Sequence, residues 1–175
     1  MLNICLYGPE SVGKTTLAKE LATYFNSIFV PEVSRDMIPT NDFTVNDIIE
    51  IGKAQTAAIL EAQKQKPELI ICDTDLITTQ IYSKIYLDYV PDILYDLEKK
   101  LHFDMFFLFE IDVPWVADGL RDLGKRRKEV YNIFKNELEK RNIPFVFVKG
   151  NWEARKKIVI EKINELLADS EKLKL

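Results

Sequence analysis

Residues 8–15 of the chain read GPESVGKT and match the pattern G-x-x-x-x-G-K-[ST] at every fixed position. Residues 3–7 before them form a short apolar run, and the residues after them carry apolar side chains at helical spacing. In this strand, loop and helix context, the loop wraps backbone N–H groups around phosphates at the N-terminus of a helix. Lys14 is expected to reach the β- and γ-phosphates, and Thr15 is expected to hold Mg²⁺. The residues predicted to bind a nucleoside triphosphate, taken to be ATP, are Gly8, Pro9, Glu10, Ser11, Val12, Gly13, Lys14, Thr15 and Thr16.

A second chemical signal is the apolar run 69–72, which leads directly into Asp73. Ligands of open α/β sheets collect at the carboxyl ends of the strands, so Asp73 is expected to face the phosphate loop and hold Mg²⁺. Strand-ending aspartates also serve as turn residues or helix N-caps, and that alternative stays open for Asp73 and Asp75. Motor ATPases usually place a glutamate after the aspartate to activate water, whereas this chain has Thr74. Transfer to a bound acceptor is therefore favoured over hydrolysis.

An acceptor site is expected where the second strand candidate ends, in residues 29–36. Phosphoryl transfer needs a carboxylate that can accept a hydroxyl proton near the γ-phosphate, and a charged group that orients the acceptor. Glu32 and Arg35 meet these two needs. The alternative is a solvated loop that carries an ordinary ion pair.

The rest of the pattern predicts the elements that position these residues. Apolar strand candidates alternate with longer helical patterns, which predicts an α/β fold: a three-layer P-loop NTPase with a five-stranded parallel sheet flanked by helices. Thr44, with Asp47 three residues later, is expected to cap the second helix, and Pro67 is expected to end it. Residues 1–168 are expected to form a single domain, followed by a short polar tail at 169–175. We expect strands at 3–7, 27–30, 69–73, 105–110 and 145–149, and helices at 14–25, 45–65, 77–87, 92–101, 127–141 and 152–168.

Length and composition exclude several classes of protein. The 175 residues suit one domain, and no apolar stretch approaches the ~20 residues that a membrane span needs. The opening apolar run leads into the phosphate loop and is no signal peptide, so a soluble cytoplasmic protein is expected. The net charge is -4 and no long basic run occurs, so the sequence shows no electropositive surface for a nucleic-acid backbone. Cys5 and Cys72 fall in apolar strand candidates, where reduced thiols act as small buried hydrophobes.

Five short motifs follow one another along the chain: the phosphate loop, VPEVSR at 30–35, IGKAQ at 51–55, CDTD with TTQ within 72–80, and DVPW with DGLR within 112–121. Together they resemble the ribosylnicotinamide kinase domain of the NadR family, over nearly the whole chain. The resemblance implies a P-loop nucleoside kinase fold, with ATP and Mg²⁺ as cofactors. It also implies phosphorylation of the 5′-hydroxyl of nicotinamide riboside, which gives nicotinamide mononucleotide and ADP.

Known members of the family often fuse this domain to an adenylyltransferase, and sometimes to a DNA-binding repressor. The sequence contains one histidine, His102, so it lacks the H-x-G-H site of an adenylyltransferase. The kinase is expected to begin at residue 3, and no repressor module is expected before it. His102 itself is expected to be structural.

A physical interpretation agrees with this acceptor. Nicotinamide riboside carries a cationic aromatic ring, which aromatic faces and carboxylates hold well. Tyr82 and Tyr86 lie four residues apart on one helical face, and Trp115 begins the segment after the fourth strand. The alternative for such a tyrosine pair is packing in the core or on the surface. Carboxylates that could bind the ribose hydroxyls are Asp36, Asp75 and Asp118.

Residues 118–127 contain two glycines and four basic residues ahead of a helical pattern. A closing lid needs such hinges and such cations, which meet the charge of the transferring phosphoryl group on closure. Arg121 and Arg126 are the catalytic candidates here, together with Arg127, and the alternative is a solvated helix face. Asn151 follows the last strand, where related kinases let a loop pass the adenine, and it is a candidate there.

Two other functions remain open from the sequence. A nucleoside or nucleotide kinase with a different substrate would use the same machinery. A nucleotide-controlled switch or ATPase is the second alternative, which Thr74 and the length of the chain disfavour. The oligomeric state and the choice between ATP and GTP are not encoded in any recognisable motif.

Overall fold

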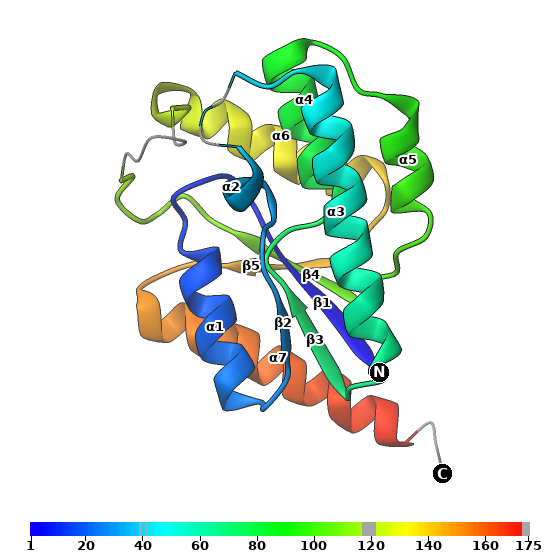
Figure 1. Ribbon diagram of the computed structural model, residues 1–175. Coiled ribbons are helices and arrows are strands. Elements are labelled where there is room, and N and C mark those ends of the chain that lie inside the picture. The colour runs from blue at the N-terminus through cyan, green and yellow to red at the C-terminus, as the bar shows by residue number, and fades with distance from the viewer. Residues whose placement is uncertain (39, 41, 117–121, 173–175) are drawn as a thin grey trace.

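The computed structural model describes residues 1–38, 40, 42–116 and 122–172 of the chain. Its centre is a five-stranded sheet in the order β2-β3-β1-β4-β5, in which every pair of neighbouring strands is parallel (Figure 1). This arrangement confirms the predicted α/β fold. The strands are β1 (Leu2–Tyr7), β2 (Ile28–Val30), β3 (Leu69–Cys72), β4 (Met105–Phe109) and β5 (Phe145–Val148).

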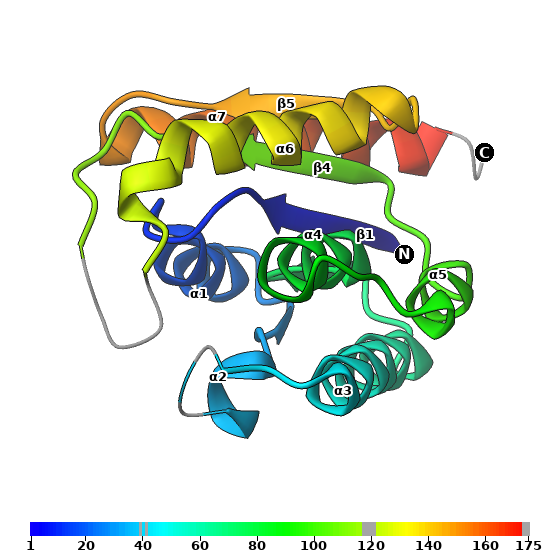
Figure 2. The ribbon, with the colours of Figure 1, turned by 90° about the horizontal axis from the view of Figure 1, so that it is seen from above.

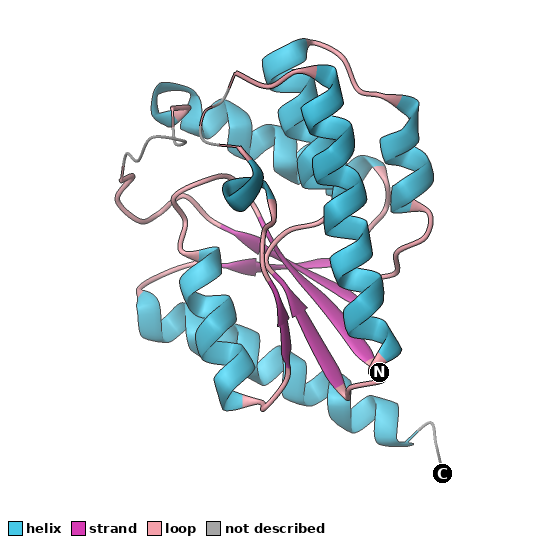
Figure 3. Ribbon diagram, in the orientation of Figure 1, coloured by secondary structure: helices cyan, strands magenta, loops and turns pink. Residues whose placement is uncertain are grey.

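Helices cover both faces of the sheet and complete three layers (Figures 2 and 3). One layer consists of α1 (Lys14–Tyr24) and α7 (Trp152–Lys172). The other layer consists of α3 (Val45–Lys64), α4 (Leu76–Leu87), α5 (Asp92–Glu98) and α6 (Arg127–Lys140). Two single-turn elements stand outside these layers: α2 (Ser34–Met37) and the 3-10 turn η1 (Gly124–Arg126).

The three central strands, β3, β1 and β4, are buried along their whole length, which explains why they read as continuous apolar runs. Along β1, Ile4 and Leu6 join the core under α1 and α7, whereas Cys5 and Tyr7 join the core under α4 and α6. All six residues of β1 are buried. Since β1 is the central strand, the loop that follows it lies at the middle of the sheet edge.

Several boundaries differ from the sequence-based expectation. The structure contains α2 where a loop was expected. The sequence did not predict this helix because four residues are too few to show an apolar period. In contrast, α5 ends at Glu98 instead of residue 101, and α7 continues to Lys172 instead of ending at 168. The predicted cap of α3 is confirmed: Thr44 and Asp47 form a reciprocal capping box.

Two further expectations concern thiols and membranes. Cys5 and Cys72 are free and buried on neighbouring strands, as predicted. Burial raises the pKa of both thiols. Among the described residues, no helix is both long enough and apolar enough to cross a bilayer.

Candidate active site

The phosphate loop connects β1 to α1 and depends on its two fixed glycines. Gly8 and Gly13 have φ values of 136° and 89°, where side chains are rarely tolerated. A Cβ at Gly8 would stand 3.1 Å from the carbonyl oxygen of Phe109, and a Cβ at Gly13 would stand 3.0 Å from the Trp152 ring. The motif therefore needs glycine at both positions for conformation and for space.

Lys14, the first residue of α1, folds back over this loop. Its Nζ donates hydrogen bonds to the carbonyl oxygens of Gly8 and Pro9, at 2.8 and 2.7 Å. Burial lowers the pKa of the ammonium group, and the carboxylates of Asp73 and Glu32 counteract that shift. The lysine therefore lies within the electrostatic reach of both acidic residues that the sequence predicts for the site.

Asp73 follows β3 directly and is 1% exposed. Among the described residues, neither of its carboxylate oxygens has a hydrogen-bond partner. Burial raises the pKa of Asp73, while Lys14 and the Thr15 hydroxyl lower it. Carboxylate and hydroxyl oxygens are ligands that Mg²⁺ accepts, directly or through water. A buried carboxylate with two uncommitted oxygens beside Thr15 therefore fits the predicted magnesium site.

Arg155, on α7, supports the phosphate loop and was not predicted from the sequence. The residue is fully buried, and its guanidinium donates to the carbonyl oxygens of Val12, Gly150 and Glu110 at 2.8, 2.9 and 2.9 Å. It also forms an ion pair with Asp112. These contacts tie the loop to the segments that follow β4 and β5. A lone arginine in a helical pattern gives no local signal of such a role, because its partner in the loop lies 143 residues away.

The segment before α6 also contacts the loop. Arg127 donates to the carbonyl oxygens of Ser11 and Val113, at 3.2 and 2.6 Å. Glu10 accepts a hydrogen bond from the backbone N–H of Leu123 at 2.9 Å. Through these bonds, Arg127 and Glu10 connect the phosphate loop to the segment before α6.

Glu32 and Arg35 lie just beyond β2, and the structure brings both to the pocket. One Glu32 carboxylate oxygen accepts a hydrogen bond from the Ser34 hydroxyl at 3.0 Å, and the other lies 3.5 Å from Arg35 Nε. Arg35 sits on α2, the short helix that sequence patterns missed.

Gln55, on α3, fixes the backbone on both sides of Glu32. Its Oε1 accepts a hydrogen bond from the Val33 N–H at 3.0 Å, and its Nε2 donates to the Pro31 carbonyl oxygen at 3.2 Å. The residue is 1% exposed. Gln55 belongs to the IGKAQ motif, but no role was predicted for it.

One pocket of about 1040 Å³, counted with its open mouth, contains the loop and Glu32 together. Polar residues of the phosphate loop and of residues 32–35 form part of its wall. Apolar and aromatic side chains form another part: Ile38, Phe43, Ile48, Ile51, Tyr82 and Tyr86. Small-molecule sites typically combine apolar walls with a few polar groups in this way.

The two predicted tyrosines both line this pocket, although they also take part in packing. Their rings are stacked with centroids 6.2 Å apart, and Phe43 meets Tyr86 edge-on at 5.2 Å. Tyr82 also packs against Phe134 of the core, and the Tyr86 hydroxyl donates to Asp122. Phe43 comes from the loop before α3, where no periodic pattern pointed to it.

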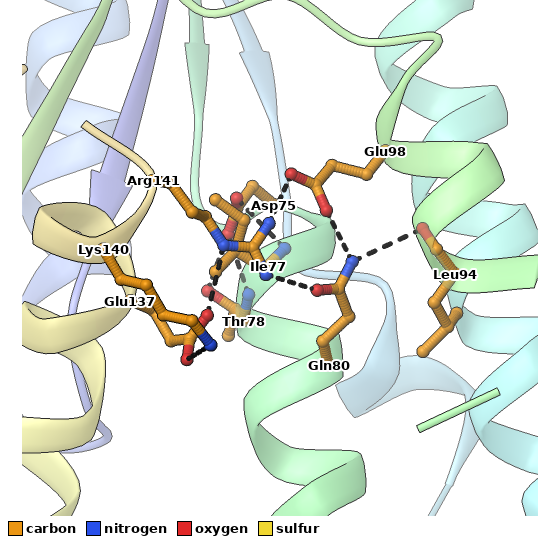
Figure 4. Close-up of polar contacts among 9 residues, drawn as sticks. All are labelled: Asp75, Ile77, Thr78, Gln80, Leu94, Glu98, Glu137, Lys140 and Arg141. Carbon is orange, nitrogen blue, oxygen red and sulfur yellow. Dashed lines mark hydrogen bonds and ion pairs between the residues drawn. The ribbon is translucent and has the colours of Figure 1, made fainter. Parts of the chain in front are cut away.

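Asp75 lies apart from the pocket and has the structural role that the sequence left open. It is the N-cap of α4, and its carboxylate accepts hydrogen bonds from the N–H groups of Ile77 and Thr78 and from the Thr78 hydroxyl. Figure 4 shows it near Arg141, at the start of α4. Burial raises the pKa of Asp75 to about 6. A carboxylate committed to three donors leaves little capacity for ribose hydroxyls.

Several other candidates also lie outside the pocket that the described residues form. Arg126 makes two hydrogen bonds to Glu129 at the surface. Asn151 accepts from the Ala154 N–H and so caps the start of α7. Trp115 packs its ring against Gly124. The remaining ones are Asp36 and Thr16, which are exposed, and Pro9, which contributes its carbonyl oxygen to Lys14. The candidates Asp118 and Arg121 fall outside the described residues.

Comparison with known proteins agrees with this fold and with the motifs. A family model described as AAA domain matches residues 3–155. The trifunctional NAD biosynthesis/regulator proteins NadR of Salmonella typhimurium and Escherichia coli are 32% and 33% identical to this chain over 95% of its length. The chain spans 43% of the length of these two relatives.

Solved structures with the same fold include two of NadR proteins. One, in complex with NR, superposes with a TM-score of 0.80 at 19% identity and covers 94% of this chain and 51% of that one. The other, in complex with NAD and AMP-PNP, has a TM-score of 0.78 at 18% identity. The match covers 95% of this chain and 49% of that one. A deoxyadenosine kinase from M. mycoides has a TM-score of 0.66 at 15% identity. The match covers 94% of this chain and 100% of that one. The chain belongs to the AAA domain family, and the resemblance to NadR proteins predicted from its motifs is confirmed over most of its length.

Proposed function

We propose that the protein is a cytoplasmic nucleoside kinase of NAD metabolism, which transfers the γ-phosphoryl group of ATP to the 5′-hydroxyl of nicotinamide riboside. The observation that carries the proposal is the single pocket that contains the phosphate loop, Glu32 and an aromatic wall. We expect the triphosphate to bind at the loop and the acceptor nucleoside to bind beside it, near Glu32 and the aromatic wall. Such proximity is the main contribution of an enzyme to phosphoryl transfer.

The donor half of the reaction follows from the loop. Backbone N–H groups at the start of α1 bind the phosphates, and Lys14 neutralises charge on the β- and γ-phosphates as it develops. Asp73 and Thr15 would hold Mg²⁺, which neutralises phosphate charge when bound. Arg155 keeps the loop in place through the Val12 carbonyl.

The acceptor half of the reaction centres on Glu32. Its carboxylate accepts the proton of the 5′-hydroxyl while that oxygen bonds to the γ-phosphorus, and the bond from phosphorus to the β,γ-bridging oxygen breaks to release ADP. Arg35, 3.5 Å from Glu32, orients the carboxylate or the acceptor. Gln55 keeps Glu32 in position through its two backbone hydrogen bonds.

The choice of nicotinamide riboside draws on the pocket wall and on the relatives. A cationic pyridinium ring gains from aromatic faces, and Phe43, Tyr82 and Tyr86 supply three of them. The relatives at 32% and 33% identity are named for NAD biosynthesis, and one structure of the same fold was solved with NR. These findings support an acceptor of this class.

The test is ATP consumption by the purified chain with a panel of nucleosides. Nicotinamide riboside is expected to have the highest kcat/KM, because an uncharged base loses the cation–π contribution of about 0.5–2 kcal/mol. Uridine and thymidine serve as matched neutral acceptors. Faster phosphorylation of either would favour a kinase of different specificity, and ATP consumption that is independent of any acceptor would favour an ATPase.

A further inference from the structure

Thr74 occupies the point where the two halves of the pocket meet. It follows Asp73 at the carboxyl end of β3 and lines the pocket. In the sheet, β3 lies between β1, which leads into the phosphate loop, and β2, which leads to Glu32. A residue at this position therefore lies between the parts of the pocket assigned to the donor and to the acceptor.

The hydroxyl of Thr74 is buried without a partner. The residue is 4% exposed, and its Oγ1 makes no hydrogen bond within the described part of the chain. Seven buried side-chain atoms in that part share this condition, and three of them belong to Asp73 and Thr74. A hydroxyl can donate one hydrogen bond and accept two, so leaving it unpaired is costly.

The backbone of Thr74 adds a second, independent cost. Its φ is 121°, in a region that a β-branched residue rarely adopts. Glycine would adopt this conformation more easily, yet the chain has threonine here. Strained residues of this kind cluster where a side chain must be aimed at a ligand.

We propose that the Thr74 hydroxyl binds an oxygen of the acceptor nucleoside at the point of transfer. The phosphates of ATP already have donors in the loop backbone and in Lys14, whereas the acceptor oxygens need partners on the β2 and β3 side. Residues farther along the same segment, Thr78 and Tyr82, line the pocket together with Thr74. This assignment rests on the proposed function for the existence of an acceptor, and it adds Thr74 to the residues that bind it.

Thr74→Val is the direct test, because it keeps the β-branch and removes only the hydroxyl. Two measurements are made: the melting temperature of the free protein, and acceptor affinity by calorimetry in the presence of Mg²⁺ and a non-hydrolysable ATP analogue. We expect the acceptor Kd to rise about tenfold, with the affinity for the ATP analogue unchanged. The melting temperature should stay equal or rise, because an unpaired buried hydroxyl has been removed.

Two further variants separate ligand binding from a structural role. Thr74→Ser keeps the hydroxyl and should retain acceptor affinity within about twofold. Thr56→Val is the matched control, because Thr56 is also buried but donates its hydroxyl to the Gly52 carbonyl at 2.8 Å. This control should leave acceptor affinity unchanged.

Three results would overturn the assignment: an unchanged acceptor Kd in Thr74→Val, an equal loss of affinity for the ATP analogue, or a lower melting temperature. The probe is nicotinamide riboside or, if the wild-type chain does not bind it, the best acceptor of the nucleoside panel. If nicotinamide riboside is the wrong acceptor, the wild-type protein will not bind it. If the role of Thr74 is wrong, the wild type will bind the acceptor and Thr74→Val will bind it equally well. Binding of no nucleoside at all would overturn both.

Discussion

Asp73 and Asp75 lie two residues apart and are 1% and 2% exposed, yet their hydrogen bonding differs. Asp73 faces the phosphate loop, and neither of its oxygens has a hydrogen-bond partner among the described residues. Asp75 accepts three hydrogen bonds from Ile77 and Thr78 and begins α4. The same residue type at the same depth therefore leaves its oxygens uncommitted in one case and caps a helix in the other.

The surroundings of the two aspartates repeat this difference. Beside the first turns of α4, Arg141 donates to Glu98 at 2.6 Å, to Gln80 at 2.8 Å and to Glu137 at 3.1 Å (Figure 4). Gln80 in turn donates to Glu98 at 2.7 Å. This cluster joins α4, α5 and α6, and its polar groups are paired with one another. We call these four residues the Arg141 cluster.

The comparison separates two uses of buried polarity. A paired cluster rigidifies the fold, because each group already has its partner. Buried groups without partners cost free energy in the isolated protein, so their presence at Asp73 and Thr74 points to ligands that supply the missing bonds. Substitutions in the pocket should therefore affect turnover, whereas substitutions in the Arg141 cluster should affect stability.

The largest expected effect is that of Lys14→Ala. Loss of the cation that meets the developing phosphate charge should lower kcat about 100-fold or more, with a melting temperature close to that of the wild type. Lys19→Ala, an exposed lysine of the same helix, is the control and should retain full turnover. Normal turnover in a folded Lys14→Ala protein would show that this pocket is not the site of phosphoryl transfer.

The second effect is that of Arg141→Met. Removing the guanidinium takes charge-assisted hydrogen bonds from Glu98 and Gln80 in a partly buried site, so the free energy of unfolding should fall by about 3 kcal/mol. Urea unfolding measures this loss, and kcat per folded molecule should remain unchanged. The control is Lys140→Met, because Lys140 is 79% exposed and lies 3.9 Å from Glu137. A strong loss of kcat without a loss of stability would reverse the assigned roles.

The smallest effect is a pH dependence carried by Asp75. Its pKa of about 6 in the folded protein exceeds the ordinary 3.8, so the stabilisation from this group is complete below pH 3.8 and is lost as the pH rises through 6. Between pH 4 and 6.5 the wild type should therefore lose about 2 kcal/mol more than Asp75→Asn. Unfolding curves of both proteins across this range give the comparison, and parallel pH profiles would show that Asp75 does not titrate this way.

The sequence predicted the parts of the molecule whose signals are local. The phosphate loop has all of its fixed residues within residues 8–15, and the three central strands are continuous apolar runs because they are fully buried. The Thr44 cap was also predictable, because both partners of the capping box lie within one helical turn. Local patterns of this kind determine conformation with little help from distant residues.

The sequence did not predict the parts that depend on distant contacts. Arg155 and Gln55 have ordinary helical neighbours, and only the fold brings them to Val12 and to the backbone around Glu32. The role of Asp75 was also not predictable from the sequence, because a carboxylate that follows a strand can bind a ligand or cap the helix that it begins. The choice depends on where the first turn of α4 begins.

Mg²⁺ titration of turnover in Glu32→Gln and Asp73→Asn, with saturating acceptor, tests the central claim most directly. The claim is that the unpaired oxygens of Asp73 serve the metal, while Glu32 serves the acceptor proton. Asp73→Asn should need more Mg²⁺ and recover part of its turnover with added Mg²⁺ or Mn²⁺. Glu32→Gln should stay about 10²- to 10⁴-fold slow at every metal concentration, with its affinity for ATP almost unchanged. Rescue of Glu32→Gln by metal, without rescue of Asp73→Asn, would contradict the account and exchange the two roles.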